Sequence, residues 1–309
     1  MKMKKFISLL TVTTMVAGMA VGCGNSSSDS SSDATSTADS TEASADWDSS
    51  SDITIVSRED GSGTRGAFIE LFGIEEKDAS GEKVDNTTAD AQITNSTSVM
   101  LTTVAGDDYA IGYVSLGSLD DSVKAVKIDG SEATAENIKS GDYKVSRPFN
   151  IATKSDMNNE VASDFIAFIM SKDGQKVVED NGYIPVDDAK DFEGTNPSGK
   201  AVVGGSSSVS PVMEKLIEAY KTVNPNAEIE LQTTDSTTGM TSTIDGSYDI
   251  GMASRELKDE EKAELTSQVI ATDGIAVIVN KNNPTDELST EQVYNIYTGS
   301  ALTWDEVEK

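Results

Sequence analysis

The segment Ser57–Arg65 combines residue types that bind anions. It follows a β-rich run and precedes an amphipathic helical pattern, so we expect a glycine-rich turn between a strand and a helix. Such a turn directs free backbone N–H groups and the positive end of the helix at an anion. Ser62 and Thr64 would add hydroxyl donors, and Gly63 would let an anion approach the backbone. Arg58 offers a planar guanidinium that matches two oxyanion oxygens. Taken alone, the segment also fits an ordinary capped turn.

Three more segments repeat this arrangement. Gly204–Val209 precedes a helical pattern, Thr234–Gly239 precedes a shorter one, and Ser254-Arg255 follows a strand-like run. Each is a weak signal by itself, because serine and threonine also cap helices. A helix N-terminus contributes only about 0.3–2 kcal/mol to anion binding, so several must converge. Together the segments predict a site that coordinates a tetrahedral oxyanion through many neutral donors and two arginines. A further hydroxyl segment, Ser96–Ser98, is interpreted as helix capping.

Strand and helix patterns alternate between these turns. The apolar, β-rich runs lie at 53–56, 110–114, 201–203, 229–231 and 274–279. Helix start signals stand between them, with Ser210 before a proline and Ser289 with Gln292 as a capping box. The amphipathic run Val161–Ile169 is expected to end near Gly174. The alternation predicts an α/β fold with mainly parallel sheets.

The charge balance excludes several classes of function. The chain has a net charge of −29 and no histidine, which argues against nucleic-acid binding and removes the usual general base. Acidic clusters such as Asp187-Asp188 are interpreted as solvated surface, so no metal and no other cofactor is expected. Gly194–Lys200 is similar to a nucleotide-binding loop, but Ala201 stands where that motif needs Ser or Thr. The acid excess does not prevent anion binding, because salt screens exposed charges beyond ~8 Å.

The N-terminus is expected to export and anchor the chain. Residues 1–22 join a lysine-rich start to an apolar run that closes in small residues, which is typical of a signal peptide. The run leads into Cys23 in a sequence that resembles a bacterial lipobox, so Cys23 is the predicted lipidation site. It is the only cysteine of the sequence, which excludes an intramolecular disulfide. Residues 23–51 are rich in Ser, Asp, Thr and Ala, and we expect a disordered tether because they bury too little apolar surface to fold.

Five segments together resemble one known family. They are Ile53–Arg65, Ala110–Gly117, Ser146–Phe149, Gly205–Pro211 and Asp249–Leu257. All look like signature segments of the phosphate-binding proteins of phosphate ABC importers, the PstS-type members of the periplasmic-binding-protein superfamily. The resemblance covers nearly all of the chain from residue 52 onward. It implies a type II fold, in which two α/β lobes are joined by a hinge and close over one phosphate.

The order of these segments differs from that of the family. There, the part that resembles 201–309 comes first and the part that resembles 53–186 comes second, so the resemblance implies a circular permutation. Residues 187–200 would be the linker that joins the family's old termini, since new ends are tolerated at exposed loops and neighbouring ends can be joined. The predicted lobes are 52–146 together with 283–309, and 147–282. A misassembled or fused gene is the alternative.

The resemblance also carries the family's phosphate ligands to particular positions of this chain. It implies Arg58, Ser62, Gly63 and Thr64 from one lobe, and Ser207, Ser208 and Ser236 from the other. One position departs from the family pattern. Where many members have an aspartate that accepts the proton of hydrogen phosphate, this chain has Ser254, followed by Arg255, and both are retained as candidate phosphate-binding residues.

The departure at Ser254 leaves the proton acceptor open. Asp60 is the best remaining candidate, and Glu256 is a poorer one. A carboxylate acceptor rejects fully ionised sulfate, because sulfate brings no proton to that acceptor. Selectivity for phosphate over sulfate therefore depends on which residue takes this role.

We accordingly expect an extracytoplasmic solute-binding lipoprotein, not an enzyme, that captures inorganic phosphate and delivers it to the permease subunits of an ABC importer. It would be a monomer held by its lipid anchor on the outer face of the cytoplasmic membrane of a Gram-positive bacterium. Three alternatives remain open: binding of sulfate or molybdate, hydrolysis of phosphoesters with Ser62 as nucleophile, and sensing or adhesion without transport. The hydrolase is disfavoured because the sequence has no histidine to activate a serine.

Overall fold

The structure, a computed structural model, describes residues 47–307. The predicted signal peptide, the lipidation site Cys23 and most of the predicted tether lie outside the described residues. No helix in the described range is long and apolar enough to cross a membrane.

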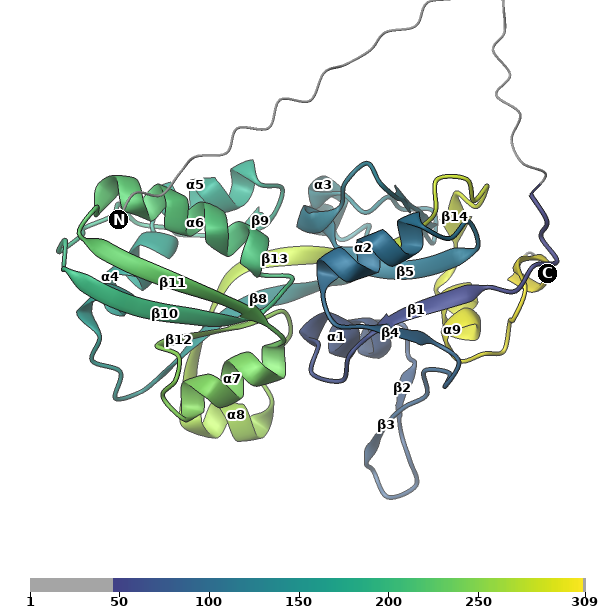
Figure 1. Ribbon diagram of the computed structural model, residues 1–309, viewed down its shortest axis with the longest axis horizontal. Helices are drawn as coiled ribbons and strands as arrows, with labels where there is room; N and C mark the ends of the chain where they lie inside the picture. The colour runs from purple at the N-terminus through teal and green to yellow at the C-terminus, as the bar shows by residue number, and fades with distance from the viewer. Residues whose placement is uncertain (1–46, 308–309) are drawn as a thin grey trace, which may run out of the picture. The chain divides into compact units, whose positions relative to one another are not determined.

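The elements of the described range alternate between strands and helices along much of the chain (Figure 1). The strands are β1 (Thr54–Arg58), β2 (Glu75–Lys77), β3 (Lys83–Asp85), β4 (Gln92–Thr94), β5 (Ala110–Ser115), β6 (Lys124–Ala125), β7 (Lys127–Ile128), β8 (Ser146–Lys154), β9 (Ile184–Pro185), β10 (Gly199–Ser206), β11 (Ala227–Thr234), β12 (Ile250–Ala253), β13 (Leu265–Val279) and β14 (Glu287–Leu288). The helices are α1 (Gly63–Leu71), α2 (Thr97–Ala105), α3 (Ala135–Ser140), α4 (Glu160–Ile169), α5 (Lys172–Asp180), α6 (Ser210–Val223), α7 (Ser236–Ile244), α8 (Asp259–Glu264), α9 (Thr290–Tyr297) and α10 (Trp304–Val307), with a 3-10 turn η1 (Leu116–Ser118).

One ten-stranded sheet connects most of these strands. Its order is β11-β10-β12-β8-β13-β5-β1-β4, and β6 and β9 each pair with β13. Strand β10 is parallel to β11 and β12, and β1 is parallel to β4 and β5. Between these two groups, β8 and β13 run antiparallel to each other and to their outer neighbours. The prediction of mainly parallel sheets is therefore wrong for the middle of the sheet. The reason is that β8 and β13 are long strands that lie between the two parallel groups and join them by antiparallel pairing, which apolar runs in the sequence do not reveal.

Two large hydrophobic cores lie at opposite ends of this sheet, and a third, smaller cluster in the described residues contains Met240, Leu257 and Leu265. One contains buried residues from 53–145 and 275–307, and the other contains buried residues from 149–271. We call the part of the chain around the first core, 53–145 and 275–307, the first lobe, and the part around the second core, 149–271, the second lobe. The two-lobe α/β architecture expected from the sequence is confirmed. Figure 1 shows β8 and β13 running between the lobes.

The change from one core to the other falls inside β13. Ala271 is buried in the second core, whereas Ile275–Val279 are buried in the first. The sequence places the boundary between the lobes at residue 282, whereas in the structure Ile275–Val279 already belong to the first lobe. The physical reason is that one continuous strand serves both lobes, so the boundary does not coincide with a loop.

Local start signals position several helices. The predicted capping box at Ser289 is confirmed, since the Ser289 Oγ accepts from the Gln292 N–H while the Gln292 side chain accepts from the Ser289 N–H. Helix α6 begins one residue earlier than expected, with Val209 as N-cap and Pro211 in the first turn. The helix at 161–169 does not continue to Gly174, because Ser171 caps a separate helix, α5.

The folded chain begins earlier than the sequence predicts. Trp47 packs its ring 4.7 Å from the Tyr109 ring and 6.0 Å from the Trp304 ring. The Asp305 N–H donates to the Ser49 carbonyl at 2.7 Å. Residues 47–51, which were predicted to belong to the disordered tether, are therefore part of the fold. A single tryptophan supplies the apolar surface that the surrounding Ser- and Asp-rich composition lacks.

Candidate anion-binding site

Thr64 is the point at which hydroxyl groups of the two lobes meet. It is the second residue of α1, it is 1% exposed, and its Oγ1 lies 2.7 Å from the Ser208 Oγ and 3.3 Å from the Ser254 Oγ. Both serines belong to the second lobe. The predicted candidates Thr64, Ser208 and Ser254 therefore form one hydroxyl cluster.

Arg58 lies beside this cluster at the end of β1. Its side chain is buried, and its Nη2 donates to the Ser207 Oγ at 3.1 Å. The Nε and Nη2 groups also donate to the two carboxylate oxygens of Glu59 at 2.8 and 2.7 Å. This bidentate pair fixes the plane of the guanidinium, and the bond to Ser207 connects it to the second lobe.

The end of β1 is held in place by a buried tyrosine. The Tyr113 hydroxyl lies 2.9 Å from the Ser57 Oγ and accepts from the Arg58 N–H at 3.1 Å. The Tyr113 ring stacks on the Phe68 ring of α1 at 3.9 Å, so the strand and the helix that flank the turn share one support. Burial raises the pKa of Tyr113 to about 12, so this hydroxyl keeps its proton at neutral pH.

The serines of the second lobe come from the ends of β10 and β12. The Ser206 Oγ lies 2.9 Å from the Ser254 Oγ and accepts from the Ser208 N–H at 3.3 Å. Gly205 has a φ of 137°, a conformation that L side chains rarely adopt, and it turns β10 toward these serines. Since Val209 is the N-cap of α6 and makes no side-chain cap bond, the hydroxyls of Ser207 and Ser208 are not used to cap that helix.

Gly63 allows the two lobes to approach closely. A Cβ atom at this position would lie 2.8 Å from the Ser254 Oγ and closer still to the Ser236 Oγ. Ser236 is the first residue of α7, and its Oγ accepts from the Ser254 N–H at 3.1 Å. The predicted candidates Gly63 and Ser236 are thus brought to the same place. Ser62 is also buried there, and its Oγ caps α1 by accepting from the Arg65 N–H at 3.3 Å.

Three predicted candidates lie away from the hydroxyl cluster. The Asp60 side chain is 98% exposed and pairs with Arg65 at 2.7 Å. Glu256 is exposed as well. The Arg255 guanidinium donates to both carboxylate oxygens of Glu261, at 2.7 and 2.8 Å, and to the Thr237 Oγ1 at 3.3 Å. Neither acid is in position to accept a proton from an anion at Thr64, and Arg255 is engaged elsewhere.

Arg147 is a residue of this site that the sequence analysis missed. Its side chain is 2% exposed, and its Nη2 donates to the Thr64 Oγ1 at 3.1 Å. It lies inside β8, so no turn or helix start marks it as an anion ligand. The segment Ser146–Phe149 stood out in the sequence only through its resemblance to a family.

Thr97 lies beside the cap of α2 and contacts the hydroxyl cluster. Ser96 caps α2 by accepting from the Val99 N–H at 3.3 Å, as predicted for this hydroxyl segment. The Thr97 Oγ1 instead lies 3.4 Å from the Ser207 Oγ and 3.3 Å from the Ser208 Oγ. A helix cap and a hydroxyl of the cluster therefore occupy adjacent residues, which a residue pattern alone does not separate.

The cluster has the chemistry of an oxyanion site. Each hydroxyl group of the cluster can donate one hydrogen bond and accept others. The guanidinium groups of Arg58 and Arg147, which contact the cluster, are donors only. No group of His, Cys, Asp and Glu residues that could hold a metal ion occurs in the described range. The arrangement can therefore bind an anion by hydrogen bonds and charge.

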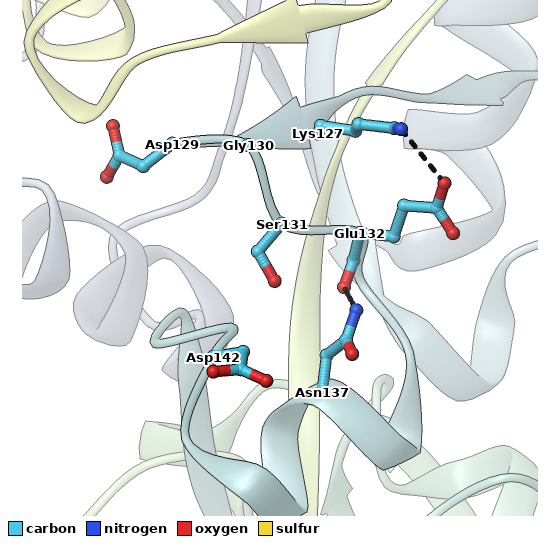
Figure 2. Close-up of a pocket in the computed structure, with 7 residues that line it drawn as sticks. All are labelled: Lys127, Asp129, Gly130, Ser131, Glu132, Asn137 and Asp142. Atoms are coloured by element: carbon cyan, nitrogen blue, oxygen red, sulfur yellow. Dashed lines mark hydrogen bonds and ion pairs between the residues drawn. The ribbon is translucent and has the colours of Figure 1, made fainter.

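A separate cavity of about 450 Å³ in the first lobe does not share these residues (Figure 2). Figure 2 shows Lys127 paired with Glu132, and Asn137 directed at the Glu132 backbone. The Lys127 Nζ lies 3.1 Å from the Glu132 Oε1, and the Asn137 Nδ2 donates to the Glu132 carbonyl at 3.0 Å. Asp129 accepts from the Thr290 N–H at 2.9 Å. Because these polar groups bind one another, we do not assign a ligand to this cavity.

Comparisons with known proteins agree with the fold. Residues 19–173 and 192–309 match the model of the PBP superfamily domain. The phosphate-binding protein PstS 2 of Streptococcus agalactiae is 56% identical over 311 residues, covering 100% of each chain. The PstS 2 protein of Streptococcus pneumoniae is 43% identical, again over 100% of each chain. The crystal structure of a phosphate-binding protein of a phosphate ABC transporter from S. pneumoniae has 46% identity and a TM-score of 0.66, covering 83% of this chain and 100% of that chain.

The two-lobe fold and the match to the family model thus define a protein of the periplasmic-binding-protein superfamily. Within it, the chain belongs to the PstS-type family of phosphate-binding proteins.

Proposed function

We propose that this protein captures inorganic phosphate between its two lobes and delivers it to an ABC-type phosphate importer. The observation that carries the proposal is the meeting of hydroxyl groups from both lobes at Thr64, beside the buried guanidinium of Arg58. Support comes from the relatives, which are named phosphate-binding proteins and match along the full length of the chain. Many neutral donors with a planar cation suit a tetrahedral oxyanion, because charge-assisted hydrogen bonds to it are strong.

The proposed ligands are the residues that the structure brings together. They are Arg58, Ser62, Gly63, Thr64, Ser207, Ser208, Ser236 and Ser254. Ser62 belongs to the set because its hydroxyl accepts a bond from the Arg65 N–H and so retains its own proton for an anion. Asp60 and Arg255 are left out, since one is exposed and the other is bound to Glu261.

Binding is proposed to couple to a movement of the lobes. The Arg58–Ser207 and Thr64–Ser208 contacts span the two lobes, and the Thr237 N–H donates to the Gly61 carbonyl across the same boundary at 3.2 Å. An anion reaches the buried hydroxyls only when these contacts are broken. We propose that β8 and β13 bend where the core changes, between Ala271 and Ile275, and that phosphate stabilises the closed arrangement.

The chain is proposed to act by binding alone, without making or breaking a bond. It would be a monomer attached by a lipid at Cys23 to the outer face of the cytoplasmic membrane in a Gram-positive bacterium. Relatives from Streptococcus support the choice of organism class. The alternative phosphoester hydrolase would need a base for Ser62, and the sequence has no histidine.

The order of the segments is proposed to result from circular permutation. Two features of the structure support it. The described ends lie side by side, since the Ile53 N–H donates to the Leu302 carbonyl at 2.8 Å, as expected for ends cut from neighbouring positions. The proposed linker, residues 187–200, packs on the second lobe through Phe192, whose ring meets the Phe168 ring edge-on at 5.4 Å. A linker that follows the surface of one lobe can join old termini without crossing the anion site.

Equilibrium dialysis tests the proposal. Protein freed of ligand by unfolding and refolding is dialysed against labelled phosphate, with sulfate and molybdate as competitors and Thr64→Val as the matched variant. We expect the wild type to retain phosphate in a one-to-one ratio and the variant to retain much less. A folded wild type that retains no phosphate would overturn the proposal, and retention of molybdate or sulfate in its place would favour a different oxyanion.

A further inference from the structure

Arg147 presents a second buried guanidinium to the hydroxyl cluster. Its Nη2 donates to the Thr64 Oγ1 of the first lobe at 3.1 Å, and its Nε donates to the Ser254 carbonyl of the second lobe at 3.3 Å. Thr64 Oγ1 is the same atom that contacts the Ser208 and Ser254 hydroxyls. Arg147 therefore touches both lobes at the centre of the site.

Asp273 holds the opposite edge of this guanidinium. The Arg147 Nη1 donates to the Asp273 Oδ2 at 2.6 Å and to the Gly274 carbonyl at 2.7 Å. Asp273 is buried and also accepts from the Gly117 N–H at 3.4 Å. Arginine has five N–H donors in a rigid plane, so fixing the Nη1 and Nε groups leaves the Nη2 group aimed at the cluster. The Phe149 ring, 5.2 Å from the Arg147 Cζ, supports one face of the plane.

The stability of the fold does not account for this pair. Removing two charges from water is costly, and an apolar pair of similar volume often stabilises a protein as well or better. A buried arginine whose remaining donors meet the site hydroxyls is better explained by the ligand that those donors can bind.

We propose that Arg147 is a second arginine ligand of the bound phosphate, and that Asp273 is the residue that positions it. The assignment rests on the proposed function. When the anion enters, the Arg147 Nη2 and the Thr64 hydroxyl both donate to it. Since position 254 is a neutral serine, the two guanidinium groups favour the dianion over the monoanion of phosphate, because the attraction grows with the charge of the ligand.

A pH dependence of phosphate affinity could also come from titratable groups that face Arg147. They are Asp273 of β13, Arg58 of β1, Tyr143 before β8 and Tyr183 before β9. Burial raises the pKa of both tyrosines, so both remain uncharged. Burial also raises the pKa of Asp273, against the opposing effect of Arg147. A variant that removes the Asp273 charge is therefore needed to separate its titration from that of phosphate, which loses its second proton near neutral pH.

Phosphate affinity at about pH 6 and about pH 8 tests the assignment, because the charge of phosphate differs between these values. The variants are Arg147→Lys, Arg147→Gln and the double variant Arg147→Gln/Asp273→Asn, which replaces the ion pair by two neutral amides and so avoids an unpaired buried carboxylate. Arg255→Gln is the matched control, since Arg255 is bound to Glu261. Thermal unfolding without phosphate establishes that each variant is folded.

We expect the double variant to lose at least about tenfold in affinity at the higher pH and less at the lower pH. Arg147→Lys, which keeps the charge, should retain the preference for the higher pH, and Arg255→Gln should behave as the wild type. Equal losses at both pH values, or none, in a folded double variant would overturn the assignment while leaving the proposed function intact. A folded wild type that binds no phosphate at either pH would overturn the proposed function and this assignment together.

Discussion

The Thr64 Oγ1 and the Ser208 Oγ lie 2.7 Å apart, although 144 residues separate them in the sequence. One comes from the start of α1 in the first lobe, and the other follows β10 in the second. Replacing Thr64 by valine keeps the volume and removes the hydroxyl. Because that hydroxyl also contacts the Arg147 Nη2, we expect Thr64→Val to weaken phosphate binding by at least about tenfold, as measured by titration at neutral pH. Unchanged affinity in a folded Thr64→Val protein would remove Thr64 from the ligand set.

Two glycines in one helix provide a test of the close approach between the lobes. Gly63→Ala places a Cβ against the Ser236 and Ser254 hydroxyls, so we expect a large loss of phosphate affinity. Gly66→Ala is the control in the same helix, because its Cβ would only touch the Arg255 side chain at 3.8 Å. We expect it to bind phosphate as the wild type does and to be more stable by roughly 0.5–1 kcal/mol. Similar affinities in the two variants would show that the lobes do not need to meet at Gly63.

Asp60 is expected to have little influence on phosphate binding. Its carboxylate is 98% exposed and pairs with Arg65, and exposed ion pairs contribute only about 0–1 kcal/mol. Titration of Asp60→Asn with phosphate and with sulfate should therefore match the wild type within a fewfold. A marked loss of phosphate affinity, or a gain of sulfate binding, would restore Asp60 as the acceptor of the phosphate proton.

The ion pair between Glu261 and Arg255 is expected to make the free energy of unfolding depend on pH. Burial raises the pKa of Glu261, but the bonds from Arg255 and the Lys258 N–H outweigh burial and hold the pKa below its ordinary value of 4.5. A lowered pKa in the folded state gives stability that is present above the unfolded pKa and is lost as the pH falls through the folded pKa. Urea unfolding should therefore show Glu261→Gln to be less stable than the wild type by on the order of 2 kcal/mol at neutral pH, and the gap should close as the pH falls below 4.5. A gap of constant size across this range would contradict the role given to the ion pair.

Strands that are buried on both faces could be predicted from the sequence. β1, β5 and the centre of β10 appear as short apolar runs because their burial leaves no alternation. The first half of β13 could not be predicted in the same way, because Thr266–Gln268 are polar and exposed while they pair with β8. The antiparallel pairing between β8 and β13 could therefore not be predicted either, because one of its two strands was only half recognised.

The turn residues of the candidate site could be proposed from the sequence because each stands at an element boundary. Arg58 ends a strand, Thr64 begins a helix, and Ser208 lies between a strand and a helix. Arg147 has no such mark, since it lies within β8 and its partner Asp273 is 126 residues away. Asp60 shows the opposite case, because it is adjacent to Arg58 in sequence but its carboxylate is exposed and pairs with Arg65.

Calorimetric titration of residues 47–309, freed of bound ligand, with phosphate and then with sulfate tests the central claim most directly. The sample used for this titration must include Trp47, because its ring packs on Tyr109 in the folded protein. The account predicts saturable one-to-one binding of phosphate, with sulfate bound more weakly. A folded sample that gives no heat with phosphate, or that binds sulfate more tightly, would contradict it.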